Sequence, residues 1–460
     1  MLDDSESGAA SGKQSGDKSE GGSQPKSMKT VFLERIRCSG WMSSVLPFNI
    51  ALGPVGTLVQ LLILNFNGTV LEVGLAITLF NAVSVPAALF WGFVTDRFQR
   101  RRFLIVASFL STALILVLFV FAQTGYWVSF LYALFSFATT ASTTPLNLLV
   151  METESKTKWA SAFAKFSMIS SVGQTVGLLL GMVGSVYFSL EYLVIPLAIL
   201  SLISAGLAGF LIKEPEVVFE RQVLVMHKPS FFLRLRHSPY LFLRIPRVHH
   251  FKRIFMNLRH ELTRHTPLLY LAISFFFLSA GIFNTSLVPA LEANGISSLL
   301  IFAVIMLGMV VQIVAFRFAG RYAERKSLVK TAVGGLVLRA VGYGALGVFA
   351  YLLTGLWFLI PVLIFYPLSS GIAYSIYYTS SNTMIFNTLS PKRNGSYLGV
   401  YSALAGVATM GGSFASGFLS FYLGFYVTFL ISAAFLGVAA WLLSLTVSSQ
   451  MSVKSAAVSG

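Results

Sequence analysis

The chain has 460 residues, of which 55% are hydrophobic and 11% are charged, and it carries a formal net charge of +16. Soluble domains carry about 25% charged residues, so this composition excludes an ordinary soluble domain and points to a membrane protein. The basic residues lie between hydrophobic runs and not on one polar domain, which excludes nucleic acid as the partner. The single cysteine, Cys38, excludes an internal disulfide framework and a thiol-based metal cluster.

Residues 1–38 are rich in Ser, Gly, Lys and Asp and lack the apolar core of a signal peptide, so we predict a disordered tail. Twelve apolar runs follow, and a spanning helix needs about 20 such residues. The runs cover 43–65, 72–94, 103–122, 127–150, 160–186, 192–212, 267–289, 297–317, 330–353, 356–385, 395–420 and 425–447. We therefore predict an all-α membrane protein with twelve transmembrane helices and a second tail at 448–460.

Among the connections between these runs, only alternate ones contain lysine or arginine. Neither residue occurs in the connections 66–71, 123–126, 187–191, 290–296, 354–355 and 421–424. The opposite connections hold Arg102, Lys156, Lys326 and Arg393, and the long loop 213–265 adds more. By the positive-inside rule, this basic side and both termini are cytoplasmic, and we expect the protein in the plasma membrane.

Motifs in the first six runs recur in the last six. GFVTDR at 92–97 follows the second run, and GRYAER at 320–325 follows the eighth. Gly177 in the fifth run matches Gly412 in the eleventh. We therefore predict two pseudo-symmetric six-helix bundles, joined by a basic cytoplasmic linker loop. The predicted bundles are 39–212 and 266–447, with the linker at 213–265. Such duplication, with a substrate path between the halves, is the common plan of secondary transporters.

The segment GFVTDRFQRRR, Gly92 to Arg102, resembles the signature loop of the major facilitator superfamily. That family's pattern is Gly-x-Leu-Ala-Asp-Arg-x-Gly-Arg-Arg/Lys, from which Val94, Thr95 and Gln99 depart. GRYAERK at 320–326 is similar to the family's degenerate second copy. The resemblance covers about residues 40–447 and implies a transporter, without enzyme activity or cofactor.

The resemblance also implies that the Asp96 carboxylate latches the cytoplasmic gate against span eleven. Gly92 would let two helices approach closely, and a carboxylate can meet a helix N-terminus or an arginine. The arginines after it have a simpler interpretation as topology anchors among anionic headgroups. The predicted gating residues are Gly92, Asp96, Arg97, Arg100, Arg101, Gly320, Glu324 and Arg325.

Polar side chains inside the spans are the candidates for a substrate cavity, because exposure to lipid is costly. Each can equally form a hydrogen bond between helices. Asn147 and Asn382 are at related positions in the two halves, so pseudo-symmetry would turn both toward the central axis. Tyr374, Tyr377 and Tyr378 share one helix face, for which an aromatic packing stripe is the alternative. The predicted cavity residues are Asn49, Gln60, Asn81, Asn147, Lys165, Gln174, Asn284, Gln312, Arg339, Tyr374, Tyr377, Tyr378 and Asn382.

Arg339 is the basic residue predicted nearest the middle of the bilayer. A charge there costs on the order of 2.5–3.5 kcal/mol by insertion scales, so it needs a partner or a cavity. We hypothesise that it neutralises an anionic substrate group; bonds to backbone carbonyls are the alternative. No Asp or Glu falls in the middle of a span, so facilitated diffusion, exchange and coupling to H+ or Na+ all stay open.

All six histidines lie in the linker, which reads as a basic amphipathic segment on the inner leaflet, and we expect no metal site. No GxxxxGK[ST] loop is present, which argues against ATP-driven pumping. We predict a monomeric secondary transporter that moves a small organic solute by alternating access. Efflux of an amphipathic or anionic compound is favoured over uptake of a sugar or nutrient, and a non-transporting receptor is the alternative from another class.

Overall fold

The computed structural model describes the backbone of residues 28–97, 100–153, 159–212, 267–325, 327–388 and 394–458. Side chains are described for residues 40–92, 94–95, 100–150, 165–212, 268–319, 327–384 and 404–445. Residues from Trp41 onward belong to one compact unit, with which the following paragraphs deal. Residues 1–27 of the predicted tail and the linker with its histidines lie outside the described residues, whereas residues 28–38 of that tail are helical.

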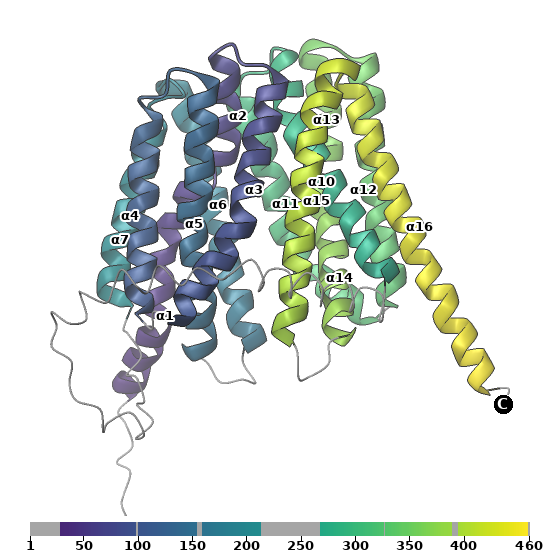
Figure 1. The fold of residues 1–460 in the computed structure, drawn as a ribbon, viewed down its shortest axis with the longest axis horizontal. Helices are drawn as coiled ribbons and strands as arrows, with labels where there is room; N and C mark the ends of the chain where they lie inside the picture. The colour runs from purple at the N-terminus through teal and green to yellow at the C-terminus, as the bar shows by residue number, and fades with distance from the viewer. Residues whose placement is uncertain are drawn as a thin grey trace, which may run out of the picture. The chain divides into compact units, whose positions relative to one another are not determined.

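The first six predicted spans are helical. They correspond to α1 (Met28–Leu52) with α2 (Val55–Asn65), α3 (Val70–Arg97), α4 (Arg101–Phe119), α5 (Gly125–Thr153), α6 (Trp159–Tyr187) and α7 (Val194–Leu211). Two helices make the first span because Gly53 and Pro54 interrupt it, and proline has no N–H to continue a helical ladder. Figure 1 shows these helices, in purple to teal, running side by side.

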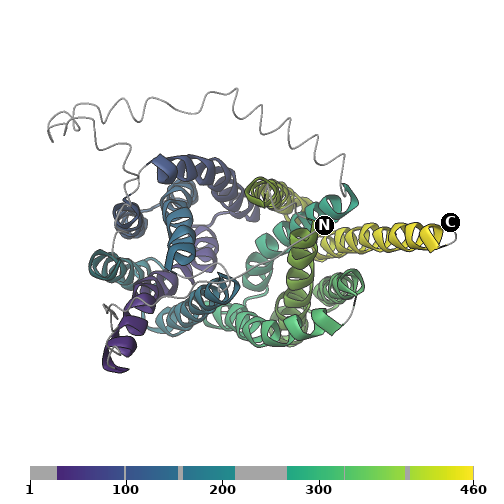
Figure 2. The ribbon, with the colours of Figure 1, turned by 90° about the horizontal axis from the view of Figure 1, so that it is seen from below.

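The last six predicted spans are helical as well. They correspond to α10 (Pro267–Ala293), α11 (Ser298–Arg325), α12 (Leu328–Leu352), the segment η3 (Gly355–Phe358), α13 (Leu359–Tyr366), η4 (Pro367–Ala373) and α14 (Tyr374–Thr388), then α15 (Asn394–Leu423) and α16 (Phe425–Val458). Gly355 and Gly424 turn the chain with φ of 65° and 82°, a conformation that glycine adopts without strain. Figure 2 shows this second group of helices beside the first, seen along the helices.

Eleven helices of the described part are long and apolar enough to cross a membrane. The remaining predicted span, α5, which is the fourth in chain order, is not apolar enough to be counted among the eleven. Its second half carries Ser136, Thr139, Thr140, Ser142, Thr143, Thr144 and Asn147. It nevertheless packs against α3 and α4 within its bundle. The prediction of an all-α membrane protein is therefore confirmed, and one of its spans has a polar half.

The internal repeat extends to buried hydrogen bonds. Ser204 of α7 donates to the Ser44 carbonyl of α1, and Ser432 of α16 donates to the Ser279 carbonyl of α10 at 3.0 Å. Each pair joins the first and the last span of its bundle. All four serines are buried, so the hydroxyls need these partners in an apolar core. The same bond in both halves supports the predicted pseudo-symmetry.

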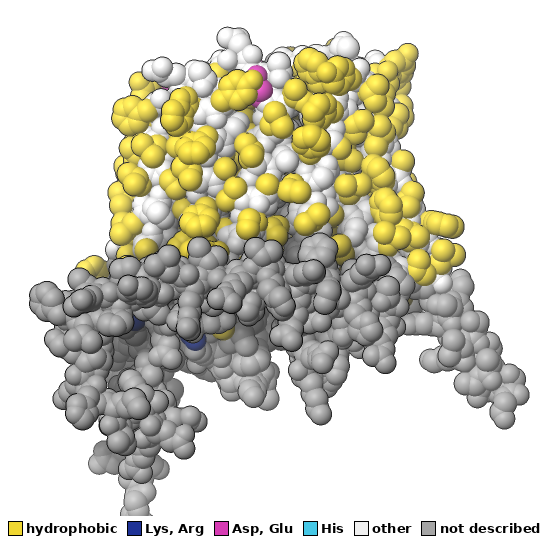
Figure 3. All heavy atoms as spheres, viewed as in Figure 1, with side chains coloured by type: hydrophobic (Ala, Val, Ile, Leu, Met, Phe, Trp, Pro, Cys, Tyr) yellow, Lys and Arg dark blue, Asp and Glu magenta, His cyan; other side chains and the backbone are white. Residues whose placement is uncertain are grey.

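The two bundles meet at the end of the molecule where the connections lack lysine and arginine, which we call the outer end; the opposite end is the basic end. A Cβ atom added at Gly74, near the start of α3, would lie 2.7 Å from the Gly417 Cα, near the end of α15. A Cβ atom at Gly181 of α6 would lie 3.1 Å from the Phe302 ring of α11. Helices of the two bundles thus come into close contact at the outer end, once backbone to backbone and once through the Phe302 ring. Figure 3 shows apolar side chains over the flank between the two ends, as a lipid-facing surface requires.

Candidate functional site

α1 and α10 carry the same Phe-Asn-x-x-x-x-Pro motif, at residues 48–54 and 283–289, a repeat that our sequence analysis missed. The two asparagines have different surroundings. Asn49 is buried, donates to the Val45 carbonyl at 3.0 Å and accepts from Ser170 Oγ at 2.6 Å. Asn284 is exposed, although residues 279–283 and 285–291 on either side of it are buried.

The difference follows from one substitution between the halves. Ala405 of α15 stands where the repeat has Ser170 of α6, so no hydroxyl is available to hold Asn284. α10 packs against α2, α3, α15 and α16, which bury most of its surface. Asn284 is the exposed member of the otherwise buried stretch 279–291, which makes it a candidate for contact with a solute.

Arg339 lies near the middle of α12 and is 3% exposed. Its Nε and Nη2 both donate to Tyr343 Oη, at 2.9 Å and 2.6 Å. Its guanidinium carbon lies 4.8 Å from the Phe276 ring centroid and 5.3 Å from that of Tyr374. The remaining nitrogen, Nη1, is buried without a hydrogen-bond partner.

This aromatic enclosure takes the place of a counter-ion. The carboxylates with described side chains are Glu72, Glu191 and Glu292, all at the outer ends of spans. A desolvated cation–π contact contributes about 2 kcal/mol, which offsets much of the cost of a charge at this depth. The predicted mid-span position of Arg339 is confirmed, and its main partners are aromatic side chains, not backbone carbonyls.

The first bundle shows what this core looks like without the charge. Phe48 stacks on Phe109 with ring centroids 4.0 Å apart, and at the related place Phe283 stacks on Tyr343 at 3.6 Å. One turn before Phe109 is Ile105, which is fully buried, whereas Arg339 precedes Tyr343 by the same spacing. The second bundle has therefore gained a buried guanidinium and the hydroxyl that binds it.

The three tyrosines of α14 divide between two sets of neighbours. Tyr374 and Tyr378 stack with centroids 5.4 Å apart and are half-buried. Tyr377 is 2% exposed and its ring lies 4.1 Å from that of Phe276. The π-helical turn η4 comes directly before Tyr374, and such turns occur often at functional sites. Tyr374 and Tyr378 form the aromatic face predicted for this span, while Tyr377 packs in the core.

One face of α5 changes from buried to exposed along its length. Ser129 and Ser136, toward the outer end, are 6% and 1% exposed, and Ser136 donates to the Phe80 carbonyl of α3 at 2.8 Å. Thr140, Thr143 and Asn147 continue the same face at about 100° per residue. Thr140 is half-buried and the last two are exposed. This face of α5 is therefore packed toward the outer end and accessible toward the basic end.

The structure brings some of the other predicted cavity residues together. Gln174 of α6 donates to Ser170 Oγ at 3.4 Å and so joins the Asn49 cluster. Gln60 and Asn81 each donate to a carbonyl of their own helix, and Lys165 is exposed. Gln312 and Asn382 are half-buried. No hydrogen bond between described side chains joins Asn147 to Asn382.

Most of the predicted gate lies outside the described side chains. Asp96 and Arg97 end α3, and Gly320, Glu324 and Arg325 end α11, but only their backbone is described. A Cβ atom at Gly92 would meet none of the described atoms within 4 Å. Arg100 is exposed and Arg101 is half-buried. Within the described residues, no group of His, Cys, Asp and Glu could hold a metal ion.

Comparison with known proteins identifies the class. A family model described as Major Facilitator Superfamily matches residues 41–367 and 269–458. The chain belongs to this superfamily of membrane transporters, as the GFVTDR and GRYAER segments predicted. A comparison with curated proteins gave no match.

Solved structures share the fold at low sequence identity. The nucleoside transporter NupG is 14% identical, with a TM-score of 0.63 over 89% of this chain and 98% of that one. A bacterial homologue of the human lysosomal transporter Spinster, in an inward-facing and occupied conformation, is 14% identical. Its TM-score is 0.64 over 92% of this chain and 97% of that one. These likenesses show the transporter fold, and the substrate has to be inferred from the residues of the site.

Proposed function

We propose that this chain exports a small organic anion with an aromatic or amphipathic body, by alternating access between the two bundles. The observation that carries the proposal is Arg339, a guanidinium buried in the middle of α12 with Nη1 unpartnered and no described carboxylate beside it. A buried charge of this kind in a spanning helix marks a functional site by default.

The side chains around it suit such a solute. Tyr374 and Tyr378 offer stacked rings, and Asn284 offers an exposed amide. Arg339 itself is almost fully buried in this conformation, so it acts on the cavity through its electrostatic field, which a low dielectric strengthens. Direct contact would require the Tyr374 ring, 5.3 Å from the guanidinium carbon, to move.

The conformation supports an assignment of sidedness. The bundles are in contact at the outer end, and the α5 face is exposed toward the basic end. We take the basic end as cytoplasmic by the positive-inside rule, which makes this an inward-facing state of a monomer in the plasma membrane. Asp96 would then form its latch only after the basic end closes. We assign no coupling ion, because the carboxylates with described side chains lie at the outer ends.

The test is thermal stabilisation of the purified protein by panels of organic anions, sugars and lipophilic cations. Wild type should be stabilised selectively by anions. Arg339→Ile combined with Tyr343→Phe, which copies Ile105 and Phe109 of the first bundle, should lose that response while remaining folded. The double variant tests the effect of the charge alone, because the isoleucine and phenylalanine that it introduces already pack at the related place in the first bundle. Stabilisation by sugars or cations that persists in the double variant would refute the anion assignment.

A further inference from the structure

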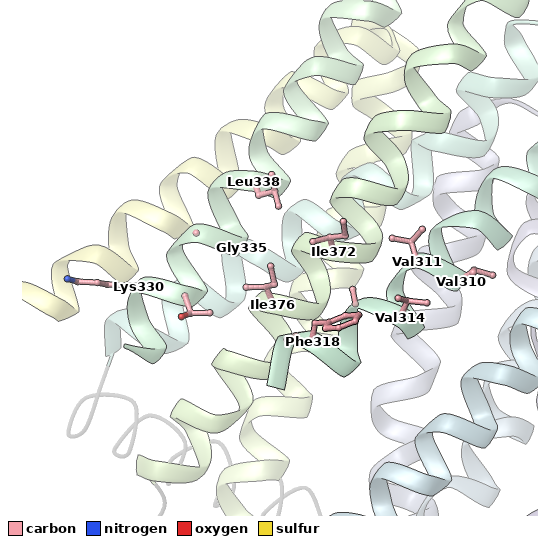
Figure 4. Close-up of a pocket in the computed structure, with 13 residues that line it drawn as sticks. Val310, Val311, Val314, Phe318, Lys330, Gly335, Leu338, Ile372 and Ile376 are labelled. Atoms are coloured by element: carbon pink, nitrogen blue, oxygen red, sulfur yellow. The ribbon is translucent and has the colours of Figure 1, made fainter. Parts of the chain in front are cut away.

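An apolar groove runs along the outside of the second bundle between α11, α12 and the η4–α14 segment. Figure 4 shows it lined by Val311, Leu338, Ile372 and Ile376, and its volume is about 670 Å³. Phe318 is 59% exposed at its margin. Because these spans cross a membrane, the groove opens onto lipid.

The first bundle has a smaller groove at the related place, between α3, α4 and α5, with a volume of about 370 Å³. There the Trp91 indole packs on Phe137 with ring centroids 5.3 Å apart and donates to the Phe137 carbonyl at 3.0 Å. The repeat has Ala319 in place of Trp91. The groove of the second bundle therefore lacks the indole ring that lines the groove of the first bundle.

Polar groups gather where the groove reaches the start of α12. Thr331 lines the groove, is 4% exposed, and its Oγ1 is buried without a hydrogen-bond partner. Lys330 is exposed beside it. The N-cap residue Ser327 makes no side-chain cap, which leaves first-turn N–H groups of α12 available. None of the described residues that line the groove is acidic.

A second groove, of about 750 Å³, lies on the other side of α12. It is lined by Val337 and Val341 and by Ser444 of α16, and it shares Lys330 with the first. Figure 4 shows the Lys330 side chain extending away from Ile372 and Ile376, and Lys330 is among the lining residues of both grooves.

We propose that this site binds one anionic phospholipid from the leaflet at the basic end. The phosphate accepts hydrogen bonds from the Lys330 ammonium and the uncapped N–H groups of α12. Thr331 Oγ1, which is buried in this conformation, turns toward the phosphate when the lipid binds. One acyl chain occupies each groove. An uncapped helix start and a lysine attract an anion, and the protein supplies no partner for the buried Thr331 hydroxyl. The site is separate from the proposed substrate cavity, so either proposal can fail alone.

Native mass spectrometry of the full chain in detergent, with phosphatidylglycerol or phosphatidylcholine of the same acyl chains, tests the site. Wild type should retain one phosphatidylglycerol in preference to phosphatidylcholine. Lys330→Ala should weaken its binding about fivefold, and Thr331→Val, which keeps the side-chain shape, should also weaken it. Arg102→Ala, at the related start of α4, is the matched control and should change binding less than twofold. Equal losses in all three variants, or no preference between the lipids, would overturn the proposal.

A groove variant separates a lipid from a free phosphate ion. Ala319→Trp copies Trp91 of the first bundle and fills the groove while leaving Lys330 and Thr331 in place. Phosphatidylglycerol retention should fall in this variant if an acyl chain occupies the groove. Stabilisation of wild type by inorganic phosphate alone, unchanged by Ala319→Trp, would instead identify an anion site and refute the lipid. Melting temperature and gel filtration verify that each variant is folded.

Discussion

At the scale of single residues, Arg339 and Tyr343 behave as one unit. Two guanidinium nitrogens share the Tyr343 hydroxyl, and the Tyr343 ring stacks on Phe283 with centroids 3.6 Å apart. The Tyr343 hydroxyl accepts the guanidinium hydrogen bonds, and the Tyr343 ring packs in the core. Removing either partner alone should therefore cost more than removing both.

Tyr343→Phe should destabilise the protein by about 1–3 kcal/mol, because it leaves donors of a buried charge unpaired. Adding Arg339→Ile should recover part of that loss, since replacing both polar partners by apolar groups can be nearly neutral. Thermal unfolding in detergent of the wild type, both single variants and the double variant measures the coupling. A double variant less stable than Tyr343→Phe would show that the pair is not a closed unit.

At the scale of helices, glycines determine how closely the spans approach. A Cβ atom at Gly177 of α6 would lie 2.9 Å from the Ile50 carbonyl carbon of α1. At the repeated position, a Cβ atom at Gly412 of α15 would lie 3.0 Å from the Leu278 carbonyl carbon of α10. Both obstacles are backbone atoms, which cannot rotate away. The close approach at Gly177 in the fifth span therefore recurs at Gly412 in the eleventh, the residue that the repeat pairs with it.

Gly177→Ala and Gly412→Ala should each lower stability by about 1–3 kcal/mol, the usual cost of overpacking a filled core. Gly437→Ala on α16 is the matched control, since a Cβ atom there meets nothing within 4 Å. It should leave the melting temperature unchanged or raise it, because alanine favours a helix over glycine by up to about 1 kcal/mol. Equal effects at all three positions would mean that helix propensity, and not the close approach, explains the glycines.

At the scale of the whole molecule, helices of the two bundles are in close contact at the outer end. Gly74 and Gly417 bring α3 and α15 together, and Gly181 of α6 packs on Phe302 of α11. Alternating access requires these contacts to separate when the opposite end closes. A substitution that prevents the close approach should therefore shift the conformational equilibrium.

Gly74→Val should favour separation of the outer end, because its Cβ would lie 2.7 Å from the Gly417 Cα. Spin labels at Phe121→Cys and Tyr422→Cys, on a Cys38→Ser background, place one exposed probe on each bundle at the outer end. Their distance distribution, measured by double electron–electron resonance, should move to longer distances. Gly206→Val, at a position of α7 where a Cβ atom would meet nothing within 4 Å, should leave the distance distribution unchanged. A distribution unaffected by Gly74→Val would show that this contact does not hold the outer end closed.

Prediction from the sequence was more complete for the fold than for the site. Hydropathy and the placement of arginine and lysine predicted twelve spans, and the family match confirms the class. Among the site residues, Arg339 was predicted at mid-depth, but its enclosure by Phe276 and Tyr374 was not, because those rings come from two other helices. The repeat of Phe-Asn-x-x-x-x-Pro was visible in the sequence and would have linked Asn49 with Asn284.

The sequence by itself determined the all-α membrane class, the internal duplication and the family, because these follow from hydropathy and local motifs that each segment carries alone. The tertiary structure decided which polar side chains are bound by the protein and which are exposed. Asn49 and Asn284 occupy the same place in the repeat, yet one is bound by Ser170 and the other is exposed. The reason is that exposure depends on the neighbouring helix, where Ser170 in one half corresponds to Ala405 in the other, and only packing brings those positions together.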